Sequence, residues 1–274
     1  MILYPPAKIN LGLYVVSQRD DGFHSIETLF YPLGLQDILE FVPNINEEGA
    51  KDCLSLSGLS IPGVVGENLL LKACELYREH VPIPPISLHL HKRIPMGAGL
   101  GGGSADASYL LRGLNAEFGG RLSQQELAAM ALEIGSDCPY FLCSGPAIGR
   151  GRGELLESSS LNLSGYYFYL FHPGIHVSTK KAYHGVSLFA GIPGLEDIIS
   201  RGPGSWRGAL LNSFESSVFK EFPAIASLKD ELYASGAIYA AMSGSGSAVF
   251  GLFDKQTELS SSLLAQLVWS ECID

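Results

Sequence analysis

The chain has 274 residues, of which 46% are hydrophobic and 17% charged, a globular composition that excludes a disordered chain. Its formal net charge of −10 argues against nucleic acid or an anionic membrane as the main partner, because phosphate groups attract basic faces. No apolar run approaches the roughly 18–20 residues needed to cross a bilayer, and the first residues lack the pattern of a signal peptide. The five scattered cysteines are typical of free buried thiols in a reducing cytoplasm. We therefore expect a cytoplasmic globular protein.

The first third of the chain is predicted to be rich in strands. Alternating and β-branched apolar residues predict strands over 9–16, 27–33, 37–42, 53–56 and 86–94. One helix interrupts them: Asn68 can cap it, and apolar residues at helical spacing carry it to about residue 77.

The rest of the chain mixes helices and strands without a regular alternation. Helices are predicted over 104–118, from the capping box of Ser123 and Glu126 to about 134, near 179, and over 206–219, 225–234 and 258–267. Strands are predicted around 147, over 166–171 and on both sides of a glycine turn at 243–247. This mixture favours an α+β fold over a doubly wound sheet. The glycine- and serine-rich stretch at 150–160 indicates a boundary between domains 1–152 and 153–274.

The strongest local signal is the stretch PMGAGLGGGSA at 95–105, in which five of eleven residues are glycine. Glycines allow positive φ and let a ligand approach the backbone, and the helix that follows presents free N–H groups at its positive end. Phosphate binding is therefore the natural interpretation. The alternative is a tight structural turn, but a turn needs only one or two glycines.

A dinucleotide fold is the first alternative for this phosphate site. Gly97, Gly99 and Gly102 satisfy the pattern G-x-G-x-x-G, but the stretch follows some ninety residues of other elements instead of a first strand. The candidate acidic residue, Glu117, follows too soon, and the lysine-bearing pattern G-x-x-x-x-G-K-[ST] is absent.

Two further segments bear on the choice among phosphate-binding folds. Lys8 lies inside an apolar strand, and SGSGS at 243–247 forms a second glycine turn; taken alone, these would be a surface lysine and a hairpin. Together with the glycine stretch, the chain resembles the small-molecule kinases named for galactokinase, homoserine kinase, mevalonate kinase and phosphomevalonate kinase. The resemblance covers nearly the whole chain in the expected order, through AKINLGLYV, RDDGFHSIETLF, PMGAGLGGGSADA, GSDCPYFL and SGSGSAVFG.

The resemblance is greatest to those members that act on a cytidine diphosphate derivative of methylerythritol in non-mevalonate isoprenoid biosynthesis. It implies ATP-dependent phosphorylation of the C2 hydroxyl, and a two-domain α+β fold with ATP and substrate sites between the domains. Asp137 matches the catalytic aspartate and Lys8 the catalytic lysine, roles that suit phosphoryl transfer. Without the resemblance, Asp137 would more simply cap a turn. The positions that match nucleotide contacts are Asn68, Lys92, Pro95, Met96, Gly97, Ala98, Gly99, Leu100, Gly101, Gly102, Gly103, Ser104 and Ala105.

The resemblance also implies a pocket for the cytidine. It points to Asn10, Phe23, His24, Thr179 and Tyr183, with the rings of Phe23 and Tyr183 on the two sides of the base and His24 at its edge. Phe23 departs from the family, where tyrosine is common, so a hydroxyl contact would be lost while stacking survives.

A second departure concerns the metal. Magnesium is expected with ATP, but many relatives carry a magnesium-binding serine where this chain has Gly102 and Gly103, so its protein ligand cannot be assigned. The pairs His89–His91 and His172–His176 lack a third ligand and are interpreted as surface histidines.

Three alternatives to this function stay open. Another small-alcohol kinase of the homoserine or mevalonate type would lack the cytidine pocket. A dinucleotide-dependent oxidoreductase would use the G-x-G-x-x-G match. A nucleotide sensor without turnover would not need Lys8 and Asp137.

Overall fold

The computed structural model describes residues 1–44, 51–61, 65–186, 188–189 and 194–273. The chain divides into two units that are interleaved along the sequence. Unit 1 comprises Met1–Lys8, Pro32–Met96 and Gly101–Ser144, and unit 2 comprises Ile9–Tyr31, Gly97–Leu100 and Gly145–Asp274. This division differs from the single boundary after residue 152 that the sequence indicates, because a hairpin from the first half of the chain packs into unit 2.

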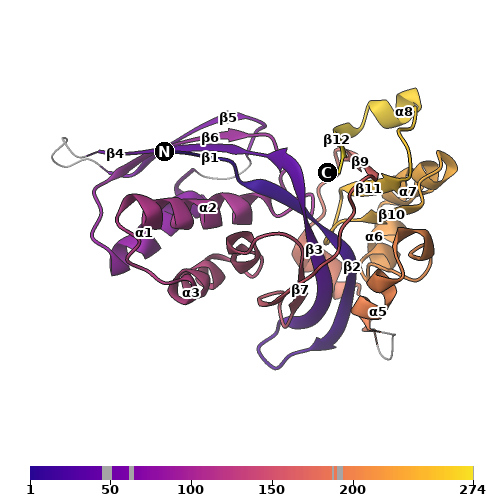
Figure 1. Ribbon diagram of the computed structural model, residues 1–274, viewed down its shortest axis with the longest axis horizontal. Helices are drawn as coiled ribbons and strands as arrows, with labels where there is room; N and C mark the ends of the chain where they lie inside the picture. Colours follow the sequence, from indigo (N-terminus) through magenta and orange to yellow (C-terminus); the bar gives the residue numbers. More distant parts are fainter. Residues whose placement is uncertain (45–50, 62–64, 187, 190–193, 274) are drawn as a thin grey trace. The chain divides into compact units, whose positions relative to one another are not determined.

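Unit 1 is a four-stranded sheet with helices on one face (Figure 1). The strand order is β1 (Ile2–Leu3), β4 (Ile38–Pro43), β6 (Ile86–Lys92), β5 (Cys53–Gly58). Leu39 pairs with Leu90 and Phe41 with Leu88, so each register pair places two apolar side chains on the buried face. That face packs against α1 (Leu69–His80), α2 (Gly102–Glu117) and α3 (Gln124–Ile134).

The ends of the unit 1 helices follow their predicted capping residues. The side chain of Asn68 accepts a hydrogen bond from the N–H of Leu70 at 3.0 Å and starts α1. Ser123 and Glu126 form the predicted capping box of α3. Short 3₁₀ turns precede α1 at Val65–Glu67 and follow α3 at Cys138–Leu142.

Unit 2 contains one further sheet and most of another, of which residues 6–8 and 32–36 belong to unit 1. One has the order β10 (Tyr239–Met242), β11 (Val249–Phe253), β9 (Tyr167–Phe171), β12 (Leu267–Cys272), and α7 (Pro223–Ala234) packs on β10 and β11. The remaining helices are α4 (Thr179–His184), α5 (Leu195–Ser200), α6 (Glu215–Glu221) and α8 (Ser261–Leu264).

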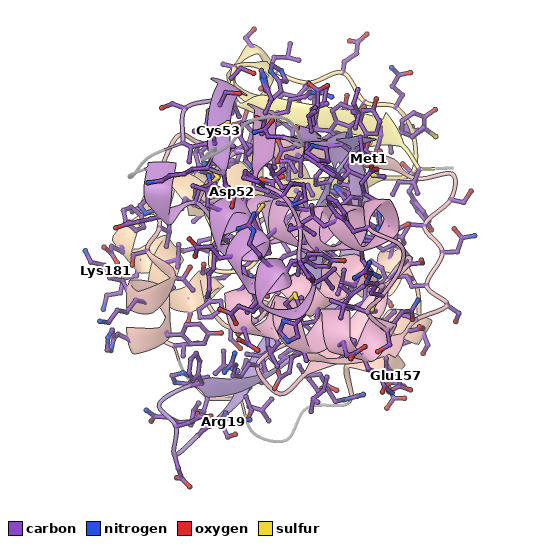
Figure 2. All side chains as sticks on the ribbon, turned by 90° about the vertical axis from the view of Figure 1, so that its left-hand side faces the viewer. Met1, Arg19, Asp52, Cys53, Glu157 and Lys181 are labelled. Carbon is purple, nitrogen blue, oxygen red and sulfur yellow. The ribbon has the colours of Figure 1, made fainter. Side chains whose placement is uncertain are left out.

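The second sheet explains the interleaving. Its order is β2 (Pro6–Gln18), β3 (His24–Gln36), β7 (Ala147–Arg150), β8 (Leu155–Ser158). The N–H of Leu13 donates to the carbonyl of Leu211, and the N–H of Ser213 donates back to the carbonyl of Leu13. The hairpin turns at Arg19, whose guanidinium pairs with Asp21 at 3.0 Å (Figure 2).

Most predicted elements are present, with two corrections. The helix predicted over 206–219 is only α6, because Asn212 uses its side chain to bond the carbonyls of Met242 and Gly244 and the N–H of Phe214. The helix predicted over 258–267 is only α8, since Ser260 caps the helix late and the chain then joins β9 as strand β12. The short elements β1, β8 and α5 were not predicted from the sequence.

Two further features bear on the sequence-based expectations. The strand pairs β1–β4, β4–β6, β3–β7, β7–β8, β10–β11, β11–β9 and β12–β9 are antiparallel and β5–β6 is parallel, unlike the parallel sheet of a dinucleotide fold. The five cysteines are free, but the expectation that all are buried is wrong, because Cys53, Cys143 and Cys272 are exposed. Among the described residues, no helix has the length and apolar character required to span a membrane.

Candidate active site

The glycine loop, residues 95–103, leads from β6 into α2. Gly97, Gly99 and Gly101 have φ of +63°, +78° and +70°, a region that side chains rarely adopt, so the alternate glycines are needed for the path of the backbone. Gly101 is the N-cap of α2 and no side chain caps this helix. The start of α2 therefore offers backbone N–H groups and the positive end of a helix dipole to an anion.

Lys8 and Asp137 meet in unit 1, beside the last part of this loop. The ammonium of Lys8 lies 3.3 Å from Oδ2 of Asp137. Lys8 is 2% exposed whereas a third of the Asp137 side chain is open to solvent. A Cβ at Gly101 would lie 3.1 Å from Cγ and Cε of Lys8 and 2.8 Å from Phe141, so the missing side chain at 101 leaves the lysine its place.

Asp137 occupies the N-cap position of the 3₁₀ turn Cys138–Leu142, yet its carboxylate forms no capping hydrogen bond. The side chain is instead paired with Lys8. The turn-cap interpretation of Asp137 therefore accounts for its backbone position but not for where its carboxylate points. The carboxylate therefore lies beside a buried cation and is open to solvent, where it can accept a proton from a nearby hydroxyl.

Lys92, a predicted nucleotide contact, is enclosed under the loop. Its ammonium is fully buried and donates to Asp37 at 2.5 Å and to Asp106 at 2.7 Å. It also lies 3.0 Å from where a Cβ of Gly102 would be. Asp37 accepts hydrogen bonds from the N–H groups of Arg93 and Ile94, just before the loop.

This buried triad (Asp37, Lys92 and Asp106) joins the two ends of the glycine loop. Asp37 holds the backbone that enters the loop, and Asp106 belongs to α2, which leaves it. The pKa of Asp106 is raised from 3.8 to about 7, chiefly by burial. Repulsion from the carboxylate of Asp37 also raises this pKa, whereas attraction to the ammonium of Lys92 lowers it. Oδ1 of Asp106 is buried and has no hydrogen-bond partner among the described residues. The geometry thus gives Lys92 a role in supporting the loop.

In unit 2, the middle of the glycine loop is bonded to the second glycine turn. The hydroxyl of Ser243 donates to the carbonyl of Gly99 at 2.8 Å, and the N–H of Ala248 donates to the carbonyl of Ala98. The same hydroxyl accepts from the N–H of Asn10 at 3.3 Å. The two glycine-rich segments and the Asn10 strand therefore form one hydrogen-bonded cluster.

The remaining predicted substrate residues lie in two groups within unit 2. The ring of Tyr183 stacks on that of His24, with centroids 4.8 Å apart, and Thr179 exchanges a hydrogen bond with Ser245 at 3.1 Å. Phe23 is 49% exposed and packs under the guanidinium of Arg152, 4.3 Å from the ring centroid. The structure thus brings Tyr183 together with His24 and Phe23 together with Arg152.

Some residues of the site were missed from the sequence. A carboxylate partner for Lys92 could have been expected, because a lysine on the buried face of a strand needs one, but no local pattern identifies it as Asp37 or Asp106. Nothing in the local sequence marks Ser243 as the side chain that bonds Gly99. Among the described residues, no three His, Cys, Asp or Glu side chains gather as metal ligands would.

The chain matches two parts of one protein family: residues 68–145 match the GHMP kinases N terminal domain, and residues 195–264 match the GHMP kinases C terminal domain. It is 46% identical over 260 residues to a protein of Cytophaga hutchinsonii named 4-diphosphocytidyl-2-C-methyl-D-erythritol kinase, with 94% of each chain covered.

Solved structures support the same grouping. A crystal structure of 4-(cytidine 5'-diphospho)-2C-methyl-D-erythritol kinase has a TM-score of 0.75 at 36% identity, over 92% of this chain and 90% of that one. A homoserine kinase of Cytophaga hutchinsonii has a TM-score of 0.61 at 20% identity, over 92% and 86%, a likeness of fold alone. The chain belongs to the GHMP kinase family, and within it to the relatives named 4-diphosphocytidyl-2-C-methyl-D-erythritol kinase.

Proposed function

We propose that this chain transfers the γ-phosphate of ATP to the C2 hydroxyl of 4-diphosphocytidyl-2-C-methyl-D-erythritol. The observation that carries the proposal is the Lys8–Asp137 pair beside Gly101 at the start of α2. It combines a proton acceptor, a buried cation and a phosphate-binding helix start within unit 1. The names of the relatives support the choice of acceptor.

Asp137 accepts the proton of the acceptor hydroxyl as that oxygen attacks phosphorus. Lys8 holds the carboxylate in place through the ion pair and offsets the negative charge that gathers around the transferred group. Because the ammonium of Lys8 is almost completely buried, its field is weakly screened by solvent.

The glycine loop and the start of α2 hold the phosphates of ATP, and Asn68 lies at the start of the neighbouring helix α1. The expected magnesium ion fits such a site as a companion of the nucleotide, since Mg²⁺ is usually held by phosphate oxygens and few protein groups. It would neutralise phosphate charge. Ser104 supplies the first hydroxyl after the glycines, but this hydroxyl already interacts with the thiol of Cys138, so no ligand is assigned.

Asn10, Phe23, His24, Thr179 and Tyr183 are proposed to bind the cytidine end of the acceptor. An aromatic ring such as that of Tyr183 stacks on any base, at about 1–3 kcal/mol, so a choice of cytosine needs a polar group, and His24 in contact with Tyr183 is the candidate. A site whose polar groups lose their partners can discriminate by up to roughly 10⁴–10⁵.

The test is a comparison of kcat/KM for ADP formation with four acceptors: the cytidyl compound, methylerythritol phosphate, mevalonate and homoserine. The cytidyl compound is expected to be the best acceptor by several orders of magnitude. The Tyr183→Ala variant is expected to lose about 1–3 kcal/mol of acceptor binding while the affinity for ATP stays unchanged. Efficient phosphorylation of an acceptor without cytidine would replace this proposal by another small-alcohol kinase.

A further inference from the structure

A groove within unit 2 lies between α6 and the segment formed by α4 and the residues before it. Its volume of about 630 Å³ is within the range of small-molecule sites. The buried side chains of Val177, Ala182 and Val218 give it an apolar floor. A Cβ at Gly185 would lie 2.9 Å from Cβ of Ser217, so the missing side chain lets the chain after α4 approach α6 closely.

The rim of this groove is cationic. Lys181 of α4 (Figure 2) and Lys220 of α6 line it from its two sides. Within the part of the chain that the structure describes, neither lysine has a carboxylate within 4.0 Å. Glu221 is the single carboxylate of the lining, and Ser178 and Ser216 add hydroxyl groups. Two lysines against one carboxylate leave a net positive charge above an apolar floor.

This groove is separate from the proposed cytidine residues on the same helix. The lining positions 178, 181, 182 and 185, which lie in α4 or cap its two ends, follow the spacing of one helical face. Thr179 and Tyr183 lie on another face, where they contact Ser245 and His24. The lining contains neither of these two residues.

One wall of the groove is also in contact with the glycine loop. His176 lines the groove, and a Cβ at Gly97 would lie only 2.5 Å from its Nδ1, so the ring lies directly against the loop backbone. The carbonyl of the preceding residue, Ile175, accepts a hydrogen bond from the hydroxyl of Ser247 in the second glycine turn. The side chain of His176 therefore contacts both the groove and the backbone of the glycine loop.

We propose that this groove is a second ligand site, which takes a small organic phosphate or diphosphate with an apolar body and is coupled to the glycine loop through His176. The phosphate oxygens accept from Lys181 and Lys220, and the apolar body lies on the floor of the groove. Binding at this site does not depend on the proposed function, since it needs neither turnover nor the acceptor.

The experiment measures binding of hexyl diphosphate to the full chain by calorimetry, with inorganic pyrophosphate and hexanol as the two halves of the probe. Each titration is made with and without a saturating non-hydrolysable ATP analogue. The test variant is Lys181→Gln with Lys220→Gln. The matched control is Lys180→Gln, which removes an exposed lysine of the same helix that does not line the groove.

The wild type and the control are expected to bind hexyl diphosphate equally, and more tightly than either half of the probe. The double variant is expected to bind it about tenfold more weakly or worse, because two charge-assisted contacts are lost. The ATP analogue is expected to change the affinity by about fivefold or more without abolishing binding. Equal affinity of the double variant, or no saturable binding by the wild type, overturns the site; an affinity that the analogue leaves unchanged overturns the coupling.

Discussion

Lys8 and Asp137 illustrate how a residue's environment decides its role. Lysine in a strand is usually a surface residue, yet Lys8 is almost fully buried and paired with a carboxylate that solvent can reach. The asymmetry suits catalysis, because the cation is fixed while the base stays accessible to an acceptor hydroxyl. Sequence similarity pointed to the pair, but only the structure shows that the carboxylate is not used as a turn cap.

Asp137→Asn removes the proton acceptor while keeping the size of the side chain. The variant is expected to bind ATP and acceptor normally and to lose about 10²–10⁴-fold in kcat. The measurement is steady-state kinetics with both substrates varied. Asp52→Asn is the control: it breaks the ion pair of Asp52 with Arg78, 2.7 Å long and also in unit 1, and should leave kcat unchanged. Equal kcat for Asp137→Asn and the wild type would return Asp137 to a structural role.

Two glycines of the loop region should respond to alanine with opposite signs. Gly101 has φ of +70° and a Cβ there would lie 2.8 Å from Phe141, so Gly101→Ala is expected to lose about 1–2 kcal/mol of stability and to displace Lys8, lowering kcat. Gly103 is helical and its Cβ would be in ordinary contact with Leu69, at 3.7 Å, so Gly103→Ala should gain about 0.5–1 kcal/mol. The free energy of unfolding in urea and kcat are measured for both variants and the wild type. A Gly101→Ala variant that is more stable than the wild type would contradict the packing argument.

At the scale of elements, the structure departs from the sequence where residues far apart meet. In β6, Ile86, Leu88, Leu90 and Lys92 alternate on the buried face, a pattern that signals a buried lysine. The pattern does not identify the carboxylates that pair with Lys92, because Asp37 lies 55 positions away in a chain with 28 acidic residues. The strands and capped helices were predictable from local spacing, but the triad that supports the glycine loop was not.

The triad predicts a specific dependence of stability on pH. The pKa of Asp106 is raised from 3.8 to about 7, chiefly by burial. Between these pH values the folded chain binds more protons than the unfolded chain, so the stability contributed by Asp106 falls as pH rises from about 4 to about 7 and then levels off. Asp106→Asn keeps a polar group near Lys92 but removes this titration.

The difference in stability between Asp106→Asn and the wild type should therefore grow in favour of the variant across that window. If about 1–3 kcal/mol of the burial cost is realised, Tm of the variant gains roughly 2–10 °C relative to the wild type between pH 4 and pH 8. Other titrating groups cancel in the comparison, because both proteins contain them. A difference in Tm that is constant with pH would show that Asp106 is ionised throughout.

At the scale of the whole molecule, the division into two units could not be predicted from the order of the residues along the chain. Residues 7–15 of β2 are buried without alternation, and a strand with both faces buried gives no sign of which core it joins. The predicted boundary after residue 152 followed composition alone. In the structure, Leu13, Val15 and Ile26 from the first hairpin belong to the same apolar cluster as Phe214 and Val249.

This interleaving predicts that residues 153–274 do not fold alone. Without the first hairpin, the cluster loses buried side chains such as Val15, and the backbone groups of Leu211 and Ser213 lose their bonds to Leu13. Circular dichroism of the fragment 153–274 is expected to show no cooperative thermal unfolding. Adding the fragment 1–152 should restore it, because that piece supplies the hairpin. The control is the same mixture with Val15→Asp in the first fragment, which should not complement. A cooperative transition of 153–274 by itself would mean that its core is complete without β2 and β3.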